Sequence, residues 1–260
     1  MAGDDVIANP KNGREIRPTV RFYGWRPTAV SLGVHQLPEV VDLAQCAANG
    51  WEVVRRPTGG RALLHNGDLS YSVTLPGGAQ SPHRLKDLYV AVAMAWIAVF
   101  RKFGLKADLA PLGRADSPGR HGLRDGLCLD SRVRGELVVG NRKITAAAQR
   151  IFPKSILQHG SVTLTGDVAA IASVLPVDSA ARSTSCIRLR QSATSLLEAA
   201  GREISPMELV DAALEPFAEN LNMRLLTDNW HDEELDQIAS RQSFHAIQTI
   251  ERVEMAAVNA

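Results

Sequence analysis

The first 165 residues of the chain contain short segments in which apolar residues alternate with polar ones or are β-branched. Gly, Pro or Asn bounds these segments, and this pattern predicts β-strands. The predicted strands span residues 19–23, 29–33, 51–56, 69–75, 136–139, 143–149 and 156–164. Gly140 and Asn141 lie between two of them and predict a tight hairpin turn.

Two helices are predicted within this strand-rich part. A helix over residues 38–48 should end at the Asn-Gly pair that follows it. A long apolar helix should begin at Pro82, with Ser81 as its N-cap, and stop before Gly104. Between them, an apolar segment ends at His65.

After residue 165 the chain predicts helices, over residues 167–175, 192–200 and 206–221, and a fraying helix or tail from about residue 243. Ser205, Pro206 and Glu208 form a capping-box pattern at the start of the third helix. Because strands dominate before residue 165 and helices after it, we predict an α+β fold. A mostly antiparallel or mixed sheet should be flanked by the helix of residues 82–103. Residues 166–260 should form a helical part of the same domain or a small appendage.

Composition excludes several classes of protein. The chain has 260 residues, is 45% apolar and 22% charged, and carries a formal net charge of +1. No strong global field therefore selects nucleic acid or an anionic membrane as a partner. The longest apolar run, residues 88–100, spans roughly 20 Å as a helix, which is short of a bilayer core of about 30 Å. The acidic start, MAGDDVIANP, does not resemble a signal peptide.

The cysteines predict reduced thiols rather than disulfides or a metal site. Cys46, Cys128 and Cys186 are odd in number and irregularly spaced, and no CxxC motif indicates zinc. A cytoplasmic protein without a bound metal is the simplest interpretation.

The segment RRPTGGRALLH, residues 55–65, is the first candidate for chemistry. Two adjacent glycines allow backbone N–H groups to approach an anionic or carbonyl oxygen. Further donors stand beside them; the candidates are Arg55, Arg56, Thr58, Gly59, Gly60 and His65. A hairpin turn with solvated arginines is the alternative.

Two more candidates follow. Lys143 opens a strand with small side chains at Ala146, Ala147 and Ala148, which permit close approach of a ligand but equally suit tight packing. His159, followed by Gly160, is equally ambiguous, since a core histidine bonded to backbone is the alternative.

Cys128 lies just after a loop, residues 110–127, that is rich in Gly and Pro and carries Arg114, Arg120 and Arg124. A reactive thiol requires an electropositive, partly exposed place, whereas burial as a small apolar side chain is the commoner role. Cys46 and Cys186 lack such a setting. We expect residues 112–126 to be mobile without ligand.

Together these segments resemble the superfamily of lipoate–protein ligases and octanoyltransferases, which shares its fold with biotin–protein ligases. RRPTGGRALLH resembles its signature, KITAAAQ its lysine motif (usually Lys-x-x-Gly-Ser-Ala), and ILQHGS the strand that follows. RFYGWRPTAVSLG resembles its first strands, and MAGDD its N-terminal Met-Ala-x-Asp-Glu. The resemblance covers roughly residues 1–165, which would be the catalytic core. Where the superfamily has Gly-Ser, this chain has Ala146-Ala147, so the close-approach glycine is missing and the acyl or nucleotide pose could differ.

The resemblance is closest to the cysteine-dependent octanoyltransferases. Their nucleophilic Cys stands in a Cys-Phe-Asp segment ahead of the lysine motif, and Cys128-Leu129-Asp130 stands fifteen positions before Lys143. The resemblance implies that Cys128 and Lys143 are catalytic and that the acyl group passes through a Cys128 thioester, without a cofactor. The donor would be acyl carrier protein. The acceptor would be a lysine of a lipoyl-accepting carrier domain, of the glycine-cleavage H type or a dehydrogenase E2 lipoyl domain.

Two alternatives remain open. An ATP-dependent lipoate–protein ligase would use ATP and Mg²⁺, hold an acyl-adenylate with Lys143 and the 55–60 segment, and leave Cys128 idle. A non-catalytic acyl-carrier binder would keep the fold without activity, and the Ala146-Ala147 pair is the feature that keeps this alternative open.

Overall fold

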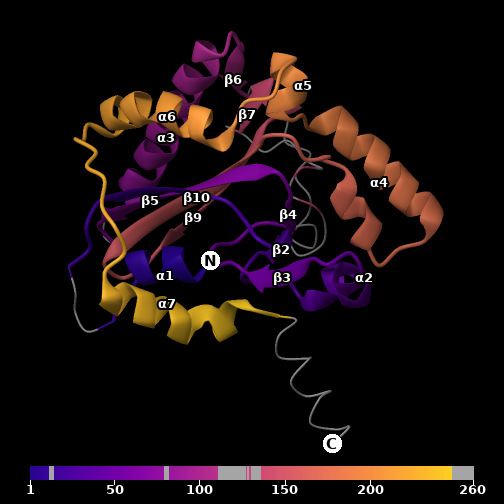
Figure 1. The fold of residues 1–260 in the computed structure, drawn as a ribbon, viewed down its shortest axis with the longest axis horizontal. Coiled ribbons are helices and arrows are strands. Elements are labelled where there is room, and N and C mark those ends of the chain that lie inside the picture. The colour runs from indigo at the N-terminus through magenta and orange to yellow at the C-terminus, as the bar shows by residue number, and fades with distance from the viewer. Residues whose placement is uncertain (12–14, 79–81, 111–126, 128, 130–135, 248–260) are drawn as a thin grey trace, which may run out of the picture.

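The computed structural model describes residues 1–11, 15–78, 82–110, 127, 129 and 136–247. Its largest sheet is four-stranded and antiparallel, in the order β1-β5-β10-β9 (Figure 1). The strands are β1 (Thr19–Tyr23), β5 (Asp68–Pro76), β9 (Thr145–Ile151) and β10 (Ser155–Thr163). In this register Gly160 stands opposite Tyr71 on one side and Ala147 on the other.

Two three-stranded sheets complete the β structure. In the first, β2 (Ala29–Leu32) pairs in parallel with β3 (Glu52–Arg55) and antiparallel with β4 (Leu63–His65). The second contains β6 (Ala107–Leu109), β7 (Leu137–Val139) and β8 (Arg142–Lys143). The predicted α+β class and the hairpin at Gly140-Asn141 are confirmed, and both turn residues have positive φ, 55° and 66°. The single sheet that we expected is three sheets.

The α-helices are α1 (Ala2–Ala8), α2 (Leu43–Ala48), α3 (Pro82–Lys102), α4 (Ser179–Ser192), α5 (Leu196–Ala200), α6 (Pro206–Leu221) and α7 (Asp232–His245). The 3₁₀ segments are η1 (Pro38–Val40) and η4 (Ala170–Val174). The predictions of α3 and α6 are confirmed, including the Ser205 cap that accepts from the N–H of Glu208. Helices α1, α4 and most of α7 were not predicted.

Several predicted boundaries are wrong, each for a local reason. The helix over residues 38–48 is interrupted because Asp42 accepts a hydrogen bond from the N–H of Gln45 and starts α2 anew. The helix over residues 167–175 is only the short η4. The helix over 192–200 begins later, where Ser195 caps α5. The strand over residues 143–149 is split at Ile144, which separates β8 from β9.

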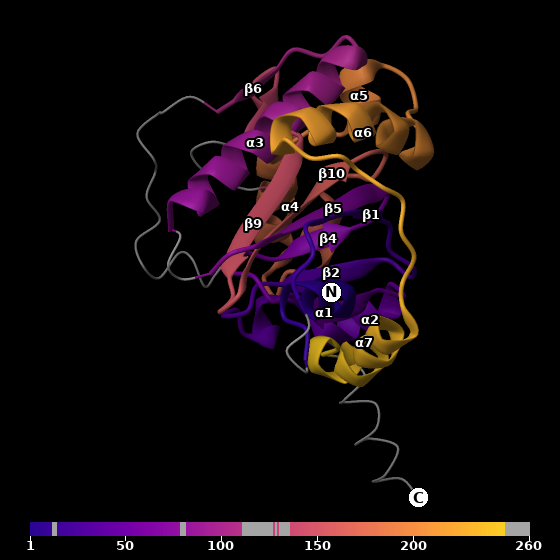
Figure 2. The ribbon, with the colours of Figure 1, turned by 90° about the vertical axis from the view of Figure 1, so that its left-hand side faces the viewer.

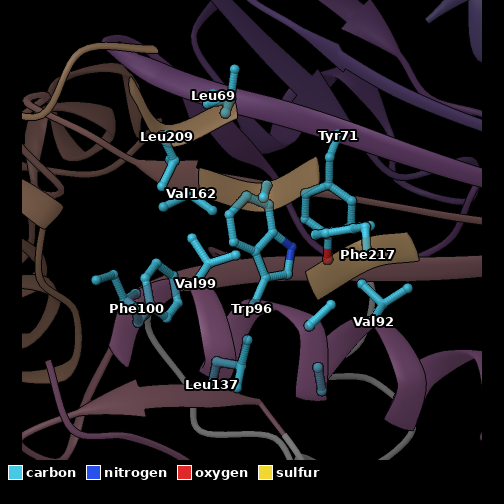
Figure 3. Close-up of a cluster of buried hydrophobic side chains, with 14 of the residues drawn as sticks. Leu69, Tyr71, Val92, Trp96, Val99, Phe100, Leu137, Val162, Leu209 and Phe217 are labelled. Atoms are coloured by element: carbon cyan, nitrogen blue, oxygen red, sulfur yellow. The ribbon is translucent and has the colours of Figure 1, made fainter. Parts of the chain in front are cut away.

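The two faces of the large sheet differ in chemistry. On one face Leu69, Tyr71 and Val73 of β5 pack against α3 and α6, where the rings of Trp96 and Phe217 lie 5.3 Å apart (Figure 3). On the other face, the alternate positions of β5 are buried hydroxyl residues: Ser70, Ser72 and Thr74. Figure 2 shows α3, α5 and α6 on one side of the molecule and β2, α1, α2 and α7 on the opposite side. The polar face of the large sheet therefore faces the three-stranded sheet of β2, β3 and β4.

The C-terminal helices pack on the N-terminal part. The Arg241 guanidinium of α7 donates to Asp5 Oδ2 at 2.9 Å and to the carbonyl of Asn9 at 2.8 Å. Nδ1 of His245 lies 2.7 Å from the carbonyl oxygen of Arg55. The division of the chain near residue 165 stays a prediction. In the described part of the chain, none of the helices combines the length and the apolar character that crossing a membrane requires.

Candidate active site

A cavity lies between the large sheet and the sheet of β2, β3 and β4. The predicted site residues that line it are Arg56, Gly60, His65, Ala146, Ala147 and Ala148. Residues that were not predicted as site residues also line it: Tyr23, Ser31, Leu63, Ser70, His159 and Gly160. The glycine-rich segment and the small residues after Lys143 therefore line one cavity.

Gly160 supplies close approach on the strand beside the alanines. A Cβ at this position would meet the Tyr71 hydroxyl at 2.6 Å and would overlap the carbonyl oxygen of Ala146. Only glycine fits at this position. The Tyr71 hydroxyl and the backbone of β9 therefore lie close to β10 beside the cavity, although residues 146 and 147 are alanines.

Arg56 closes the glycine-rich turn from inside. Its buried guanidinium donates to the carbonyls of Ser31 (2.8 Å), Gly59 (3.1 Å) and Arg61 (2.7 Å). Gly60 has φ +99°, which favours glycine. The interpretation of a turn with solvated arginines is thus wrong for Arg56, which organises the backbone around the cavity.

Three other predicted site residues of the glycine-rich segment, Arg55, Thr58 and Gly59, lie outside the cavity lining. Arg55 is half-buried and its Nη1 donates to the carbonyls of Gly33 (3.1 Å) and Gln36 (2.5 Å). Thr58 is fully buried and bonded to His159, and Gly59 contributes a carbonyl acceptor for Arg56.

Lys143 is 1% exposed and forms an ion pair with Glu136, Nζ to Oε1 2.5 Å. Its backbone carbonyl accepts from the N–H of Thr194 at 2.9 Å, which ties β8 to the segment after α4. Lys143 is not among the residues that line the cavity, although the alanines that follow it on β9 are. Its charge is therefore compensated by a carboxylate within the protein.

Cys128 lies outside the described residues, as do Arg114, Arg120, Arg124 and the loop that we expected to be mobile. Its two neighbours in sequence are described and buried. Leu127 bridges to Ala62, and the Leu129 carbonyl accepts from Ser192 Oγ at 2.7 Å. The chain is thus anchored beside the glycine-rich segment at Leu127 and beside the end of α4 at Leu129.

The other two cysteines have different surroundings. Cys46 is buried, and burial, aided by the charge of Asp42, raises the pKa of its thiol to about 11. Such a thiol is a poor nucleophile at neutral pH. Cys186 is half-buried on α4, with its Sγ 3.9 Å from the carbonyl oxygen of Ala169.

His65 is the centre of one buried hydrogen-bond relay at the cavity, which we name the His65 relay. Its Nε2 lies 2.9 Å from Ser31 Oγ, and its Nδ1 lies 2.8 Å from Asp68 Oδ2. Trp25 stacks on the ring, with centroids 4.1 Å apart. Burial alone would raise the pKa of Asp68, but the charge and hydrogen bond of His65, with hydrogen bonds from Ser161 and Ser70, outweigh burial and lower it.

His159 is the centre of a second relay, the His159 relay. Its Nε2 lies 2.6 Å from Thr58 Oγ1 and its Nδ1 lies 3.0 Å from Asp4 Oδ2. Asp4 also accepts from Arg21 (2.6 Å) and Tyr23 (2.7 Å). Burial lowers the pKa of His159, so the ring is neutral at pH 7.

The sequence did not predict three members of these relays, Asp4, Ser31 and Asp68, nor that both ring nitrogens of His159 are hydrogen-bonded. The available signal was the hydroxyl residues at alternate positions of LSYSVTL, which indicate a strand with one buried polar face. The described residues hold no cluster of three or more His, Cys, Asp or Glu side chains able to bind a metal ion.

The family model of the lipoyl protein ligase A/B catalytic domain matches residues 1–218 of the chain. The chain belongs to this family. It is 36% identical over 236 residues to an octanoyltransferase LipM of Symbiobacterium thermophilum, covering 86% of this chain and 82% of the relative. The LipM octanoyltransferase of Brevibacillus brevis is 33% identical, with 90% and 87% covered. The predicted family and the predicted enzyme class, an octanoyltransferase, are confirmed.

Solved structures of lipoate–protein ligases share the fold. A bipartite lipoate–protein ligase of Thermoplasma acidophilum, studied with its E2 lipoyl domain, superposes with a TM-score of 0.73 at 23% identity and covers 92% of this chain and 85% of its own. A lipoate–protein ligase A bound with ATP gives a TM-score of 0.72 at 22% identity, with 92% and 87% covered. At 22–23% identity these similarities show the fold alone.

Proposed function

We propose that this octanoyltransferase takes an octanoyl group from an acyl carrier protein, holds it as a thioester on Cys128, and delivers it to a lysine of a lipoyl-accepting carrier domain. The observation that carries the proposal is the placement of Cys128 fifteen positions before Lys143 in a chain whose similar relatives are LipM octanoyltransferases. The bridge between Leu127 and Ala62 supports the proposal, because it holds the residue before Cys128 beside the glycine-rich segment, part of which lines the cavity.

The reaction needs no external energy source. Exchange between two thioesters is nearly balanced, and thioester to amide runs downhill, so ATP is not required. The thiol must be ionised to attack, and a free thiol with a pKa of about 8.5 is only a few per cent thiolate at pH 7. We assign to the Lys143 ammonium, held by Glu136, the task of stabilising this thiolate and the carbonyl oxygen of the acyl group.

The cavity suits an acyl chain more than a nucleotide. Its walls combine Leu63 and three alanines with a polar edge at Ser31 and His65. Burial of an eight-carbon chain offers on the order of 5 kcal/mol at about 0.8 kcal/mol per methylene, enough for coarse selection of chain length. Arg56, which a ligase could use for phosphate, already donates to three backbone carbonyls.

The test separates transferase from ligase. Octanoyl-carrier and apo lipoyl domain are incubated with the enzyme, with and without ATP, and followed by intact mass. The wild type should gain one octanoyl group and pass it on without ATP. Cys128→Ala should lose both steps, and Cys128→Ser should retain a trapped ester or transfer slowly.

Cys46→Ala and Cys186→Ala are the matched controls and should keep acyl-enzyme formation within about twofold of the wild type, because neither thiol has a nucleophile's surroundings. If Cys128→Ala modified the lipoyl domain at the wild-type rate when given lipoate and ATP, the ligase alternative would replace the proposal. Lys143→Ala should be severely impaired under either mechanism and does not discriminate between them.

A further inference from the structure

Helix α4 buries little of its surface although it is fourteen residues long. Only Ser185 and Leu189 are buried, and Ile187 is 59% exposed. Helices that are polar on nearly all sides often bridge two domains across solvent. One side of α4 is therefore a candidate contact surface for another protein. We name it the α4 face, and its exposed residues are Ser183, Thr184, Ile187, Arg188, Arg190 and Gln191.

The charge of α4 contrasts with that of α7. Helix α4 contains three arginines and no acidic residue. Four of the first five residues of α7 are acidic, and Arg241 is its only arginine or lysine. Because the whole chain carries a net charge of +1, these two helices make the molecule electrically asymmetric. A protein with an acidic surface is attracted to α4 and repelled from α7.

The α4 face combines an apolar centre with exchangeable charges. Ile187 stands three residues before Arg190, so the two side chains lie on the same side of the helix. Arg190 pairs with Asp167 at 2.9 Å, and the two side chains are 64% and 49% exposed. Such an exposed pair contributes little to stability, so a carboxylate of a partner can take the place of Asp167. Asp178, at the N-cap, lies about three turns away and accepts from the N–H of Ala181. An apolar residue within a charged rim is the usual arrangement of a protein–protein interface.

The end of α4 is fixed to the backbone beside both predicted catalytic residues. Ser192 Oγ donates to the carbonyl of Leu129, the residue after Cys128. The N–H of Thr194 donates to the carbonyl of Lys143 at 2.9 Å. At 1.5 Å per residue, the centre of the α4 face lies about 8 Å along the helix from Ser192. A protein docked on this face is thus close to Leu129 and to Lys143.

We propose that the α4 face docks the acyl carrier protein that donates the octanoyl group, through an acidic surface of that donor. This inference rests on the proposed function. An acyl carrier protein holds its acyl group on a long pantetheine arm, so it can dock at a distance from the thiol that it acylates. The acceptor lysine has a short side chain and requires its domain closer to the thioester. A contact made by one helix face buries less than about 1,200 Å², the range of transient complexes, which suits a donor that leaves after each transfer.

The experiment measures loading of the enzyme from two octanoyl donors. Octanoyl-carrier presents a protein surface, whereas octanoyl-pantetheine has the same thioester without one, and intact mass gives the rate of acyl-enzyme formation with each. The double variant Arg188→Glu/Arg190→Glu should lower the second-order rate constant for octanoyl-carrier at low salt about tenfold, and Ile187→Ala should lower it roughly threefold. At about 0.5 M salt the loss in the double variant should shrink to less than about threefold. Both variants should load from octanoyl-pantetheine like the wild type.

Arg224→Glu is the matched control. It makes the same charge reversal in the exposed segment between α6 and α7, which runs down the side of the molecule opposite α4 (Figure 1). Because charges in solution are screened over such a separation, this variant should load from octanoyl-carrier within about twofold of the wild type.

Several results would overturn the inference. They are loading of the double variant from octanoyl-carrier at the wild-type rate, an equal loss with octanoyl-pantetheine, an equal loss in Arg224→Glu, or unchanged loading with slower transfer to the lipoyl domain. A wild-type dimer in sedimentation that the double variant dissociates would assign the α4 face to a second copy of the chain instead. A wild-type enzyme that loads from neither donor overturns the proposed function itself.

Discussion

The His65 and His159 relays place the same three groups in the same order, yet their surroundings differ. In both, a buried carboxylate faces Nδ1 and a hydroxyl faces Nε2, and both rings line the cavity. In the His65 relay the hydroxyl, Ser31, also lines the cavity. In the His159 relay the hydroxyl, Thr58, is fully buried and absent from the lining. The hydroxyl of the first relay can therefore contact a ligand in the cavity, whereas the hydroxyl of the second lies inside the protein.

The carboxylates differ in the same sense. Asp68 lies three residues from its histidine, and among the described residues its other hydrogen-bond donors are Ser70 and Ser161. Asp4 belongs to α1 and lies 155 residues from His159, and it also binds Arg21 and Tyr23. The His159 relay thus ties α1, β1, the glycine-rich turn and β10 together. A relay geometry alone does not identify a catalytic group; access of its hydroxyl to the cavity is the feature that distinguishes the two.

The largest expected difference in stability comes from the two carboxylates. Asp4→Asn leaves the Arg21 guanidinium without its carboxylate, and breaking such a buried pair costs about 3 kcal/mol or more. For a chain of this size the melting temperature should fall by roughly 10 °C. Asp68→Asn leaves no arginine without its carboxylate and should lower the melting temperature less. Thermal unfolding followed by circular dichroism measures both.

The rate of octanoyl transfer to a lipoyl domain, measured by intact mass at a temperature where both variants are folded, completes this comparison. Asp4→Asn should transfer within about threefold of the wild type. Asp68→Asn should transfer roughly tenfold more slowly, because Asp68 orients His65 and, through it, the Ser31 hydroxyl in the cavity wall. The opposite order, with Asp68→Asn the less stable and Asp4→Asn the slower, would make the His159 relay the one that positions the ligand.

The hydroxyls give the next largest contrast. Thr58→Val keeps the shape of the side chain but leaves His159 Nε2 without its 2.6 Å partner in a buried place, which should cost about 1–3 kcal/mol of unfolding free energy. Ser31→Ala should cost less, because the space at its side chain is open to the cavity. Urea titration compares the two variants, and a larger loss for Ser31→Ala would show that Ser31 is the structural member.

Helices α6 and α4 differ in how well the sequence predicts them. Helix α6 was predicted to its first residue because Ser205 and Pro206 mark it locally. Helix α4 was missed because its only buried side chains are Ser185 and Leu189, which leaves almost no apolar stripe to detect.

In the site, too, residues that share a local motif were predicted, whereas pairs formed by residues distant in sequence were not. Arg56, Gly60 and His65 were found because they share one short motif. The bond between His159 and Asp4 spans 155 residues and leaves no local pattern. The pairing of Lys143 with Glu136 crosses the β7–β8 hairpin and was not read from the sequence, since a glutamate at a strand start is ordinarily solvated.

The pH dependence of stability should report on the burial of His159. Burial lowers the folded-state pKa of His159 below its unfolded value of about 6.5. Between those two values the unfolded chain binds more protons, so the contribution of His159 to stability is complete above about pH 6.5 and is lost as pH falls. The carboxylate pKa values of Asp4 and Asp68 are lowered, so their contributions are lost only below about pH 4.

Unfolding free energies between pH 5 and 6.5 should therefore fall less steeply in His159→Gln than in the wild type, by at most about 1.4 kcal/mol per pH unit. Parallel curves for the two proteins would mean that His159 takes up a proton in the folded state as readily as in the unfolded chain.

The smallest expected effect concerns Trp25, which distinguishes the His65 relay from the other by stacking on its ring. Its Nε1–H also donates to Ser70 Oγ at 2.9 Å, so the residue supports the relay in two ways. Trp25→Phe keeps an aromatic face over the imidazole and removes only that hydrogen bond, which should cost about 1 kcal/mol or less of stability and slow transfer less than threefold. Trp25→Ala also frees the imidazole to rotate, and because His65 lines the cavity it should slow transfer severalfold more than Trp25→Phe. The ratio of the two transfer rates measures how far stacking orients His65. Equal rates would leave orientation to Asp68 and Ser31 alone, and would make Trp25 a part of the cavity wall.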